Sequence, residues 1–112
     1  MPCRGVFFDP KHGGCLRRIA RSGKRQLVVR GVFGDDEAPA RPGESWTVYG
    51  EVVREDPDGG CEIRFDFRTK RVRSKDTYTA WWRPRERHLV FDDRNAWRAM
   101  YSDWRTQLVR PW

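Results

Sequence analysis

The chain has 112 residues, of which 38% are hydrophobic and 13% aromatic, and its formal net charge is +7. This length allows one domain but not two independent cores, and the aromatic content is too high for a disordered chain. The composition excludes a membrane-spanning helix, because no apolar run approaches the roughly 18–20 residues required. The first residues also lack the apolar segment of a secretory signal.

Three short runs of extended character occupy the first third of the chain, over residues 4–8, 15–21 and 26–33. Asp9-Pro10 ends the first run and Ser22-Gly23 ends the second, and both are typical turn sequences. Residues 34–44 contain two prolines, two glycines and three consecutive acidic residues, so we expect a loop there.

The middle of the chain predicts a long hairpin. Residues 45–55 are rich in Thr, Val and Tyr, and Gly50 indicates a bulge or bend within them. Asp56-Pro57-Asp58-Gly59-Gly60 is the clearest hairpin turn of the sequence. From Cys61 to Arg68, apolar and charged residues alternate strictly, which predicts a strand with one buried face.

The last third begins with a basic connection and continues with two strands, over residues 77–83 and 87–91. A turn at residues 92–95 follows. From Trp97 onward the apolar residues fit both helical spacing and strand alternation. We expect a strand to about Met100, followed by a short helical or irregular tail.

Together these elements predict an all-β domain. Seven or eight short strands joined by short turns favour a small antiparallel β-meander, closed or nearly closed into a barrel, because closure removes exposed strand edges. We assign residues 1–100 to this single β-barrel domain and residues 101–112 to the C-terminal tail.

Five phrases in this order resemble a known pattern: Gly5-Val6-Phe7-x-Asp9-Pro10-x-His12, Arg17-x-Ile19, Trp46-Thr47, Phe65-Asp66-Phe67-x-x-Lys70 and Phe91-x-Asp93-x-Asn95-x-Trp97. They are similar to a small β-rich domain of predicted proteins from algae and other protists, a group with no established activity. Its usual wording is G-x-Y-x-D-P-x-H, W-T, V-D-F-x-x-K and W-x-D-G-N-x-W. The resemblance covers residues 5–98 and implies the architecture alone. Arg94 stands where the pattern has glycine, which puts a positive φ at that turn in question.

Charge is distributed unevenly along the chain. Residues 1–34 hold eight basic residues and one acidic residue, residues 35–67 hold three and ten, and residues 68–112 hold twelve and five. If the two basic segments converge in space, they form a positive face opposite a negative one, which suits oriented docking. Alternatively, these charges neutralise one another across adjacent strands.

The candidates for catalysis or metal binding favour a structural interpretation. Asp9 and His12 could form an acid–base pair, with Cys15 as a nucleophile, but we expect them to hold a structural turn. Cys3, His12, Cys15 and Cys61 lack the spacing of a zinc site. We therefore expect no enzymatic activity, no cofactor and no metal.

Basic and aromatic residues interleave in two tracts of the C-terminal half, and two tryptophans of the tail would add apolar anchors. This composition is typical of protein-docking surfaces and of platforms for single-stranded nucleic acid. The predicted binding residues are Arg68, Lys70, Arg71, Arg73 and Lys75, then Trp81, Trp82, Arg83, Arg85 and Arg87, and finally Trp104 and Trp112.

The function expected from the sequence is a non-catalytic interaction module, an accessory or structural subunit that docks onto a larger assembly through an acidic protein partner. The first alternative is a single-stranded RNA-binding protein. The second is a small-ligand-binding barrel, although Trp46, Phe65 and Phe67 are expected to fill so short a barrel. Three cysteines fit a reducing, intracellular compartment, either cytoplasm or an organelle interior reached by a removed presequence.

Overall fold

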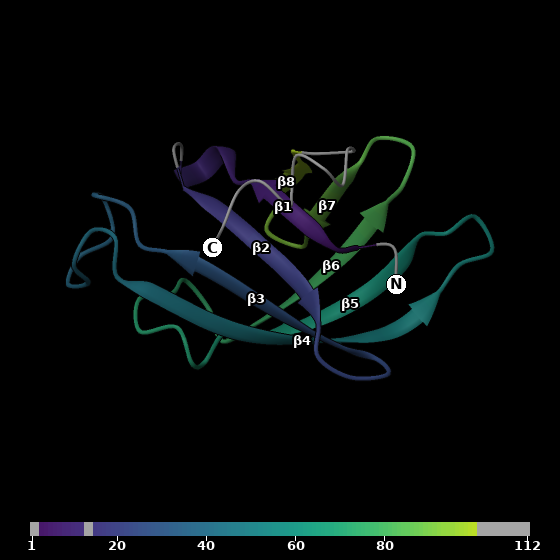
Figure 1. The fold of residues 1–112 in the computed structure, drawn as a ribbon, viewed down its shortest axis with the longest axis horizontal. Coiled ribbons are helices and arrows are strands. Elements are labelled where there is room, and N and C mark those ends of the chain that lie inside the picture. Colours follow the sequence, from purple (N-terminus) through teal and green to yellow (C-terminus); the bar gives the residue numbers. More distant parts are fainter. Residues whose placement is uncertain (1–2, 13–14, 101–112) are drawn as a thin grey trace.

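The computed structural model describes residues 3–12 and 15–100. Eight antiparallel strands follow one another around a closed barrel, so the predicted all-β meander is confirmed (Figure 1). Pairing of the first and last strands closes the barrel, with Phe7 opposite Ala99 and Phe8 opposite Arg98. The elements are β1 (Gly5–Phe8), η1 (Pro10–His12), β2 (Leu16–Arg21), β3 (Gln26–Val32), β4 (Ser45–Glu55), β5 (Cys61–Asp66), β6 (Thr77–Arg83), β7 (His88–Phe91) and β8 (Ala96–Ala99).

Side-chain alternation creates the barrel interior. In β5, Cys61, Ile63 and Phe65 are buried, while the residues between them face outward, as the strict alternation predicted. In the register of β5 and β6, Ile63 lies opposite Ala80 and Phe65 opposite Tyr78. The same period of two holds in the other long strands, which makes one continuous hydrophobic core.

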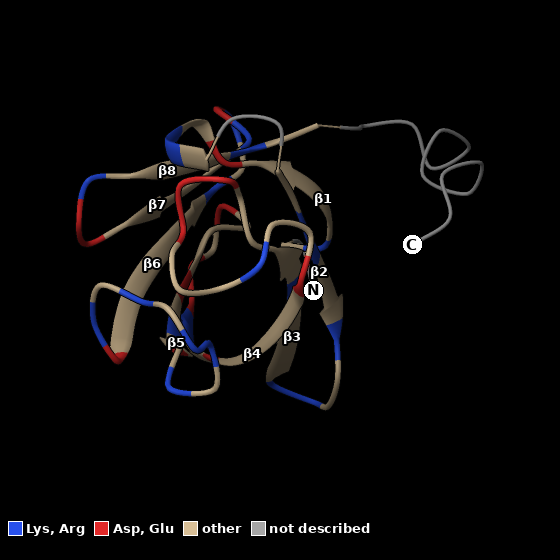
Figure 2. Cartoon of the chain, turned by 90° about the vertical axis from the view of Figure 1, so that its left-hand side faces the viewer, with Lys and Arg blue, Asp and Glu red and all other residues tan. Residues whose placement is uncertain are grey.

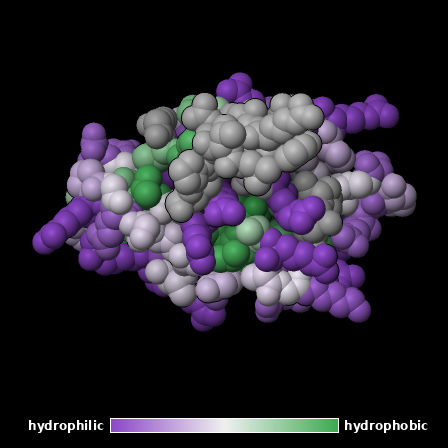
Figure 3. Space-filling view, in the orientation of Figure 1, coloured by the Kyte–Doolittle hydropathy of each residue, from purple (hydrophilic) through white to green (hydrophobic). Residues whose placement is uncertain are grey.

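The outer surface is predominantly hydrophilic. Figure 3 shows one face of the molecule, on which hydrophobic residues appear in small groups between hydrophilic ones. The exposed large hydrophobic residues of the described chain are Val32, Tyr49 and Met100. No helix among residues 3–12 and 15–100 is both long and apolar enough to cross a membrane.

Two turns show how the local sequence shapes the meander. At the predicted hairpin after β4, the Asp56 N–H donates to the Gly60 carbonyl at 2.8 Å, and Gly59 has a φ of 91°. At the turn after β7, Arg94 itself adopts a φ of 72°. Arg94 therefore adopts the positive φ that a glycine would permit at this turn. Within the turn, the Asn95 N–H donates to Asp93 Oδ1 at 3.0 Å.

Two strand glycines give room to aromatic rings. A Cβ on Gly50 would lie 2.6 Å from the Phe65 ring, and one on Gly31 would lie 2.4 Å from the Trp46 ring. The register irregularity of β4 falls between Val52 and Arg54, so the bulge predicted at Gly50 lies a few residues further along. Gly50 instead serves close packing, the other common role of a strand glycine.

The meander gives the barrel two different ends. The connections β1–β2, β3–β4, β5–β6 and β7–β8 gather at one end, which we call the long-loop end. The connections β2–β3, β4–β5 and β6–β7 form the opposite end, the hairpin end. Figure 2 looks onto the long-loop end, where acidic and basic segments surround the opening.

Candidate functional site

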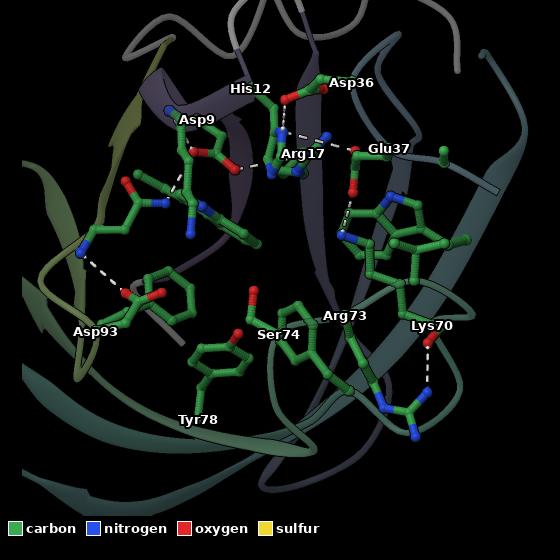
Figure 4. Close-up of a pocket in the computed structure, with 18 residues that line it drawn as sticks. Asp9, His12, Arg17, Asp36, Glu37, Lys70, Arg73, Ser74, Tyr78 and Asp93 are labelled. Atoms are coloured by element: carbon green, nitrogen blue, oxygen red, sulfur yellow. Dashed lines mark hydrogen bonds and ion pairs between the residues drawn. The ribbon is translucent and has the colours of Figure 1, made fainter. Parts of the chain in front are cut away.

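A cavity of about 220 Å³ opens at the long-loop end of the barrel (Figure 4). Four charged residues of the described chain are buried, two cations and two carboxylates, and all four line this cavity. Such burial is unusual, because charged groups leave water only when they are paired or bind something. The four are Asp9, Arg17, Glu37 and Lys70.

Arg17 enters the barrel from β2, because it shares the inward face with Ile19. Its exposed fraction is 1%. Nη1 donates to the Val32 carbonyl at 3.2 Å, and Nη2 donates to Asp9 Oδ2 at a long 3.4 Å. The guanidinium carbon lies 4.9 Å from the centre of the Trp46 ring. This aromatic face compensates part of the cost of burying the cation.

Asp9 forms the turn that the sequence predicted. Its Oδ1 accepts the Lys11 backbone N–H at 3.0 Å, which is an Asx-turn, and also accepts Asn95 Nδ2 at 2.9 Å. The second contact ties the β1–β2 connection to the β7–β8 turn. Asp9 is therefore both a turn residue and a wall of the cavity.

Lys70 and Glu37 form a buried ion pair with 2.9 Å between Nζ and Oε2, and their side chains are 8% and 6% exposed. Nζ also lies 4.8 Å from the centre of the Trp46 ring. Burial alone would raise the pKa of Glu37. Hydrogen bonds from the Gly34 N–H and Lys70, together with the charges of Lys70 and His12, outweigh burial and lower the pKa of this carboxyl.

His12 lies at the rim of the cavity, between two carboxylates. Its Nδ1 is 3.4 Å from Asp36 Oδ2 and 3.8 Å from Glu37 Oε1, so both are long charge contacts without a hydrogen bond. These three side chains have the composition of a metal site. Glu37, however, already accepts from Gly34 and from the Lys70 ammonium, and that ammonium would repel a cation bound beside it.

The first predicted basic tract lies at the long-loop end, and each of its five members is paired with an acidic residue. The N–O distances are 2.7–2.9 Å, and two of the acids come from the loop between β3 and β4. In this tract, basic and acidic residues therefore neutralise one another, which was the alternative interpretation of the charge distribution. The pairs are Arg68–Asp66, Lys70–Glu37, Arg71–Glu44, Arg73–Asp76 and Lys75–Asp92.

The second predicted tract lies at the hairpin end, so the structure does not bring the two tracts together. Trp82 is buried, and its ring centre is 5.8 Å from that of Phe7. Trp81 is half-buried on the outer face of β6, while Arg83, Arg85 and Arg87 are exposed. Trp104 and Trp112 lie outside the described residues.

Trp46, Phe65 and Phe67 are all buried in the core, as expected, and two of them also border the cavity. Phe65 is fully buried, while Trp46 and Phe67 are core residues that also form walls of the cavity. Sequence reasoning did not assign a site to Arg17, Trp46 or Glu37. The five sequence phrases that carry the resemblance could have indicated the site, because many of their residues line this cavity. These are Asp9, His12, Arg17, Trp46, Phe67, Lys70, Phe91, Asp93, Asn95 and Trp97.

The three cysteines are free and buried. Burial, followed by the charges of Glu55 and Asp56, raises the pKa of Cys61 to about 11. Burial and the neighbouring Cys61 also raise the pKa of Cys3. Both thiols therefore stay protonated near neutral pH, which disfavours them as nucleophiles.

No family model matches the chain, and neither a curated protein nor a solved structure matches it.

Proposed function

We propose that this protein is a small-ligand-binding barrel whose site is the cavity at the long-loop end. One observation carries the proposal: two residues that line an open cavity each hold a buried hydrogen-bond donor without a partner among the described residues. Arg17 Nε and Trp46 Nε1 are both buried and make no hydrogen bond within the described chain. Both residues line the cavity, and the guanidinium lies over the Trp46 ring.

Unpaired buried donors are costly, at about 1–3 kcal/mol each. Proteins rarely keep such groups without a use for them. Here they accompany an ion pair, an arginine and an aromatic lining, which together resemble the mixture of apolar walls and a few convergent polar groups found in ligand sites. A bound molecule that accepts hydrogen bonds would satisfy the donors and fill the space.

The dimensions also suit a small molecule. An apolar cavity of roughly 150 Å³ holds a benzene ring. A cavity of about 220 Å³ therefore has room for one ring with a short substituent. Ser74 and Tyr78 lie across this space from Arg17 and Asp9 in Figure 4, and their hydroxyl groups point into it.

The test is a titration of the ¹⁵N-labelled protein with four single-ring probes: toluene, acetophenone, benzoate and benzylamine. We expect at least one probe to shift the amide resonances around the cavity. Ser74 belongs to an exposed loop and lines the cavity, so Ser74→Trp should block binding while the protein stays folded. Ser22→Trp places the same side chain in an exposed turn at the hairpin end and should leave binding unchanged.

Failure of all four probes to perturb the cavity residues would contradict the proposed function. Equal loss of binding in Ser74→Trp and Ser22→Trp would contradict the proposed location.

A second candidate function is docking of an acidic partner at the hairpin end. It is supported by the half-exposed Trp81 beside Arg83 and Arg85, for which the described chain supplies no ion pair. A pull-down from cell extract with the double variant Arg83→Glu/Arg85→Glu tests it. We expect partner capture to be lost while the melting temperature stays near wild type, with Arg71→Glu/Arg73→Glu at the other end as the control. Binding to single-stranded RNA would instead show affinity that falls steeply with salt.

A further inference from the structure

We infer that the cavity takes an uncharged, planar molecule that carries hydrogen-bond acceptors, such as an aromatic carbonyl compound. This inference rests on the proposed function and names the ligand class of the same site. It follows from the hydrogen-bonding capacity that the cavity leaves unused, from the balance of its buried charges and from its aromatic walls.

The buried carboxylates of the cavity are already occupied, whereas His12 Nδ1 at the rim is buried without a partner. Both oxygens of Asp9 receive donors, from Lys11 and Asn95 on one side and from Arg17 on the other. Both oxygens of Glu37 receive donors as well, from the Gly34 N–H at 3.0 Å and from Lys70 at 2.9 Å. A ligand that offers only donors would therefore find these carboxylates engaged.

The donors of the cavity are in surplus. Arg17 Nε–H and Trp46 Nε1–H have no partner among the described residues. An ammonium group has three N–H donors, and Glu37 is the one described acceptor that Lys70 Nζ reaches. These groups can be satisfied only by acceptor atoms, so the ligand must present oxygen or unprotonated nitrogen.

Charge decides between an anionic and a neutral acceptor. The buried groups are two cations and two carboxylates, and each cation has a carboxylate partner. An anion would add an uncompensated charge next to the buried carboxylates of Asp9 and Glu37, where charge–charge repulsion is stronger than in bulk water. A neutral dipole gains the hydrogen bonds without that cost.

The walls favour a flat molecule. Trp46, Phe67, Tyr78, Phe91 and Trp97 line the cavity, and successive rings lie 4.6–6.1 Å apart between centres. Ring faces and edges of this kind pack well against another ring. The volume of about 220 Å³ limits the ligand to about one ring and a substituent.

Trp82 provides the internal comparison. Its Nε1 is also buried without a partner, and Trp82 lines a different hollow, at the hairpin end, together with Arg54 and Trp81. That hollow combines the unpaired indole with none of the four buried charged residues of the described chain. The inference depends on the coincidence of three donor-bearing side chains, Arg17, Trp46 and Lys70, in the lining of one cavity.

The four-probe titration tests this directly, because the probes share one ring and differ in charge and hydrogen bonding. We expect acetophenone, which is neutral and accepts through one carbonyl, to bind about tenfold more tightly than toluene, benzoate or benzylamine. Trp46→Phe keeps a ring and removes the N–H, and should weaken acetophenone about fivefold while toluene affinity stays within twofold. Trp82→Phe is the matched control and should change neither.

The outcomes separate the inference from the proposed function. Tighter binding of benzoate or benzylamine would overturn the uncharged ligand, and equal binding of toluene and acetophenone would overturn the role of the donors. In either case the cavity would still be a binding site. If Trp46→Phe weakened the affinities for toluene and acetophenone equally, the cause would be a change in cavity shape, and the role of the indole N–H would be overturned. Absence of binding by every probe would remove the proposed function together with the inference.

Discussion

The two ends of this barrel are built from the same eight strands, yet the buried charged residues that the structure describes all lie at the long-loop end. At the hairpin end, inward positions hold apolar residues, and Trp82 packs in the core with Phe7, Cys61 and Leu89. At the long-loop end the corresponding space is bordered by two ion pairs and a ring of aromatic side chains. The comparison indicates that the interior at the hairpin end stabilises the barrel, whereas the interior at the long-loop end is available for binding.

This difference between the two ends predicts a large energetic difference between two ion pairs whose cations, Lys70 and Arg68, belong to the same β5–β6 loop. Lys70–Glu37 is buried, whereas Arg68–Asp66 has a similar N–O distance of 2.8 Å with Arg68 67% exposed. We expect Lys70→Met to reduce the free energy of unfolding by about 3–5 kcal/mol, because Glu37 is left as an unpaired buried charge. Urea-induced unfolding measures the effect.

Arg68→Met is the matched control and should leave the unfolding midpoint almost unchanged, because solvent screens the exposed pair. The double variant Lys70→Met/Glu37→Leu should recover much of the lost stability, since it removes both charges. Equal effects of Lys70→Met and Arg68→Met would mean that the long-loop end is not a distinct buried electrostatic site.

The second prediction concerns the backbone beneath Trp46. A methyl group on Gly31 would lie 2.4 Å from the Trp46 ring and 3.0 Å from Arg17 Cδ, so Gly31→Ala must displace the wall of the cavity. We expect a loss of about 1–3 kcal/mol in stability, as for other overpacked sites, and loss of acetophenone binding.

Gly23→Ala is the control at the hairpin end, where the added carbon meets only the flexible Gln26 side chain at 3.2 Å. It should alter stability little and binding not at all. A Gly31→Ala protein with normal stability and binding would contradict the close approach of strand and ring.

The fold could be predicted because its determinants are local. Alternation over Cys61–Phe67 and the turn at Asp56–Gly60 depend on neighbours in sequence, and the register follows from them. Arg17 carried a usable signal as well, because it stands two residues before the apolar Ile19 and therefore shares its inward face.

The ion pairs at the site could not be predicted in the same way. Glu37 and Lys70 are 33 residues apart in two loops, and they meet only because β3–β4 and β5–β6 open at the same end of a closed barrel. The neutralisation of the tract 68–75 has the same origin, since Arg71 pairs with Glu44 of the β3–β4 loop. Composition indicated a basic surface there, and the topology supplied its acidic partners.

The smallest expected effect is the pH dependence of the buried pair. The pKa of Glu37 is lower in the folded protein than the ordinary value of 4.5, so this carboxylate contributes stability that is complete above pH 4.5. That contribution is lost as the pH falls through the lowered pKa, because protonation removes the charge that faces Lys70 and His12. Glu37→Gln should flatten this part of the stability curve, which urea unfolding between pH 2 and 6 measures.

Asp66 is the exposed counterpart of Glu37, because a hydrogen bond from Arg68 lowers the pKa of Asp66 to about 2 on the protein surface. Its contribution has the same sign but should diminish in about 1 M salt, where the Debye length is about 3 Å. The contribution of Glu37 should persist to a greater extent there, since its pair with Lys70 is buried and salt screens buried pairs much less. If salt removed both contributions equally, Glu37 would be as accessible to solvent as Asp66, and the long-loop end would lack the low-dielectric interior on which its selectivity for a neutral ligand depends.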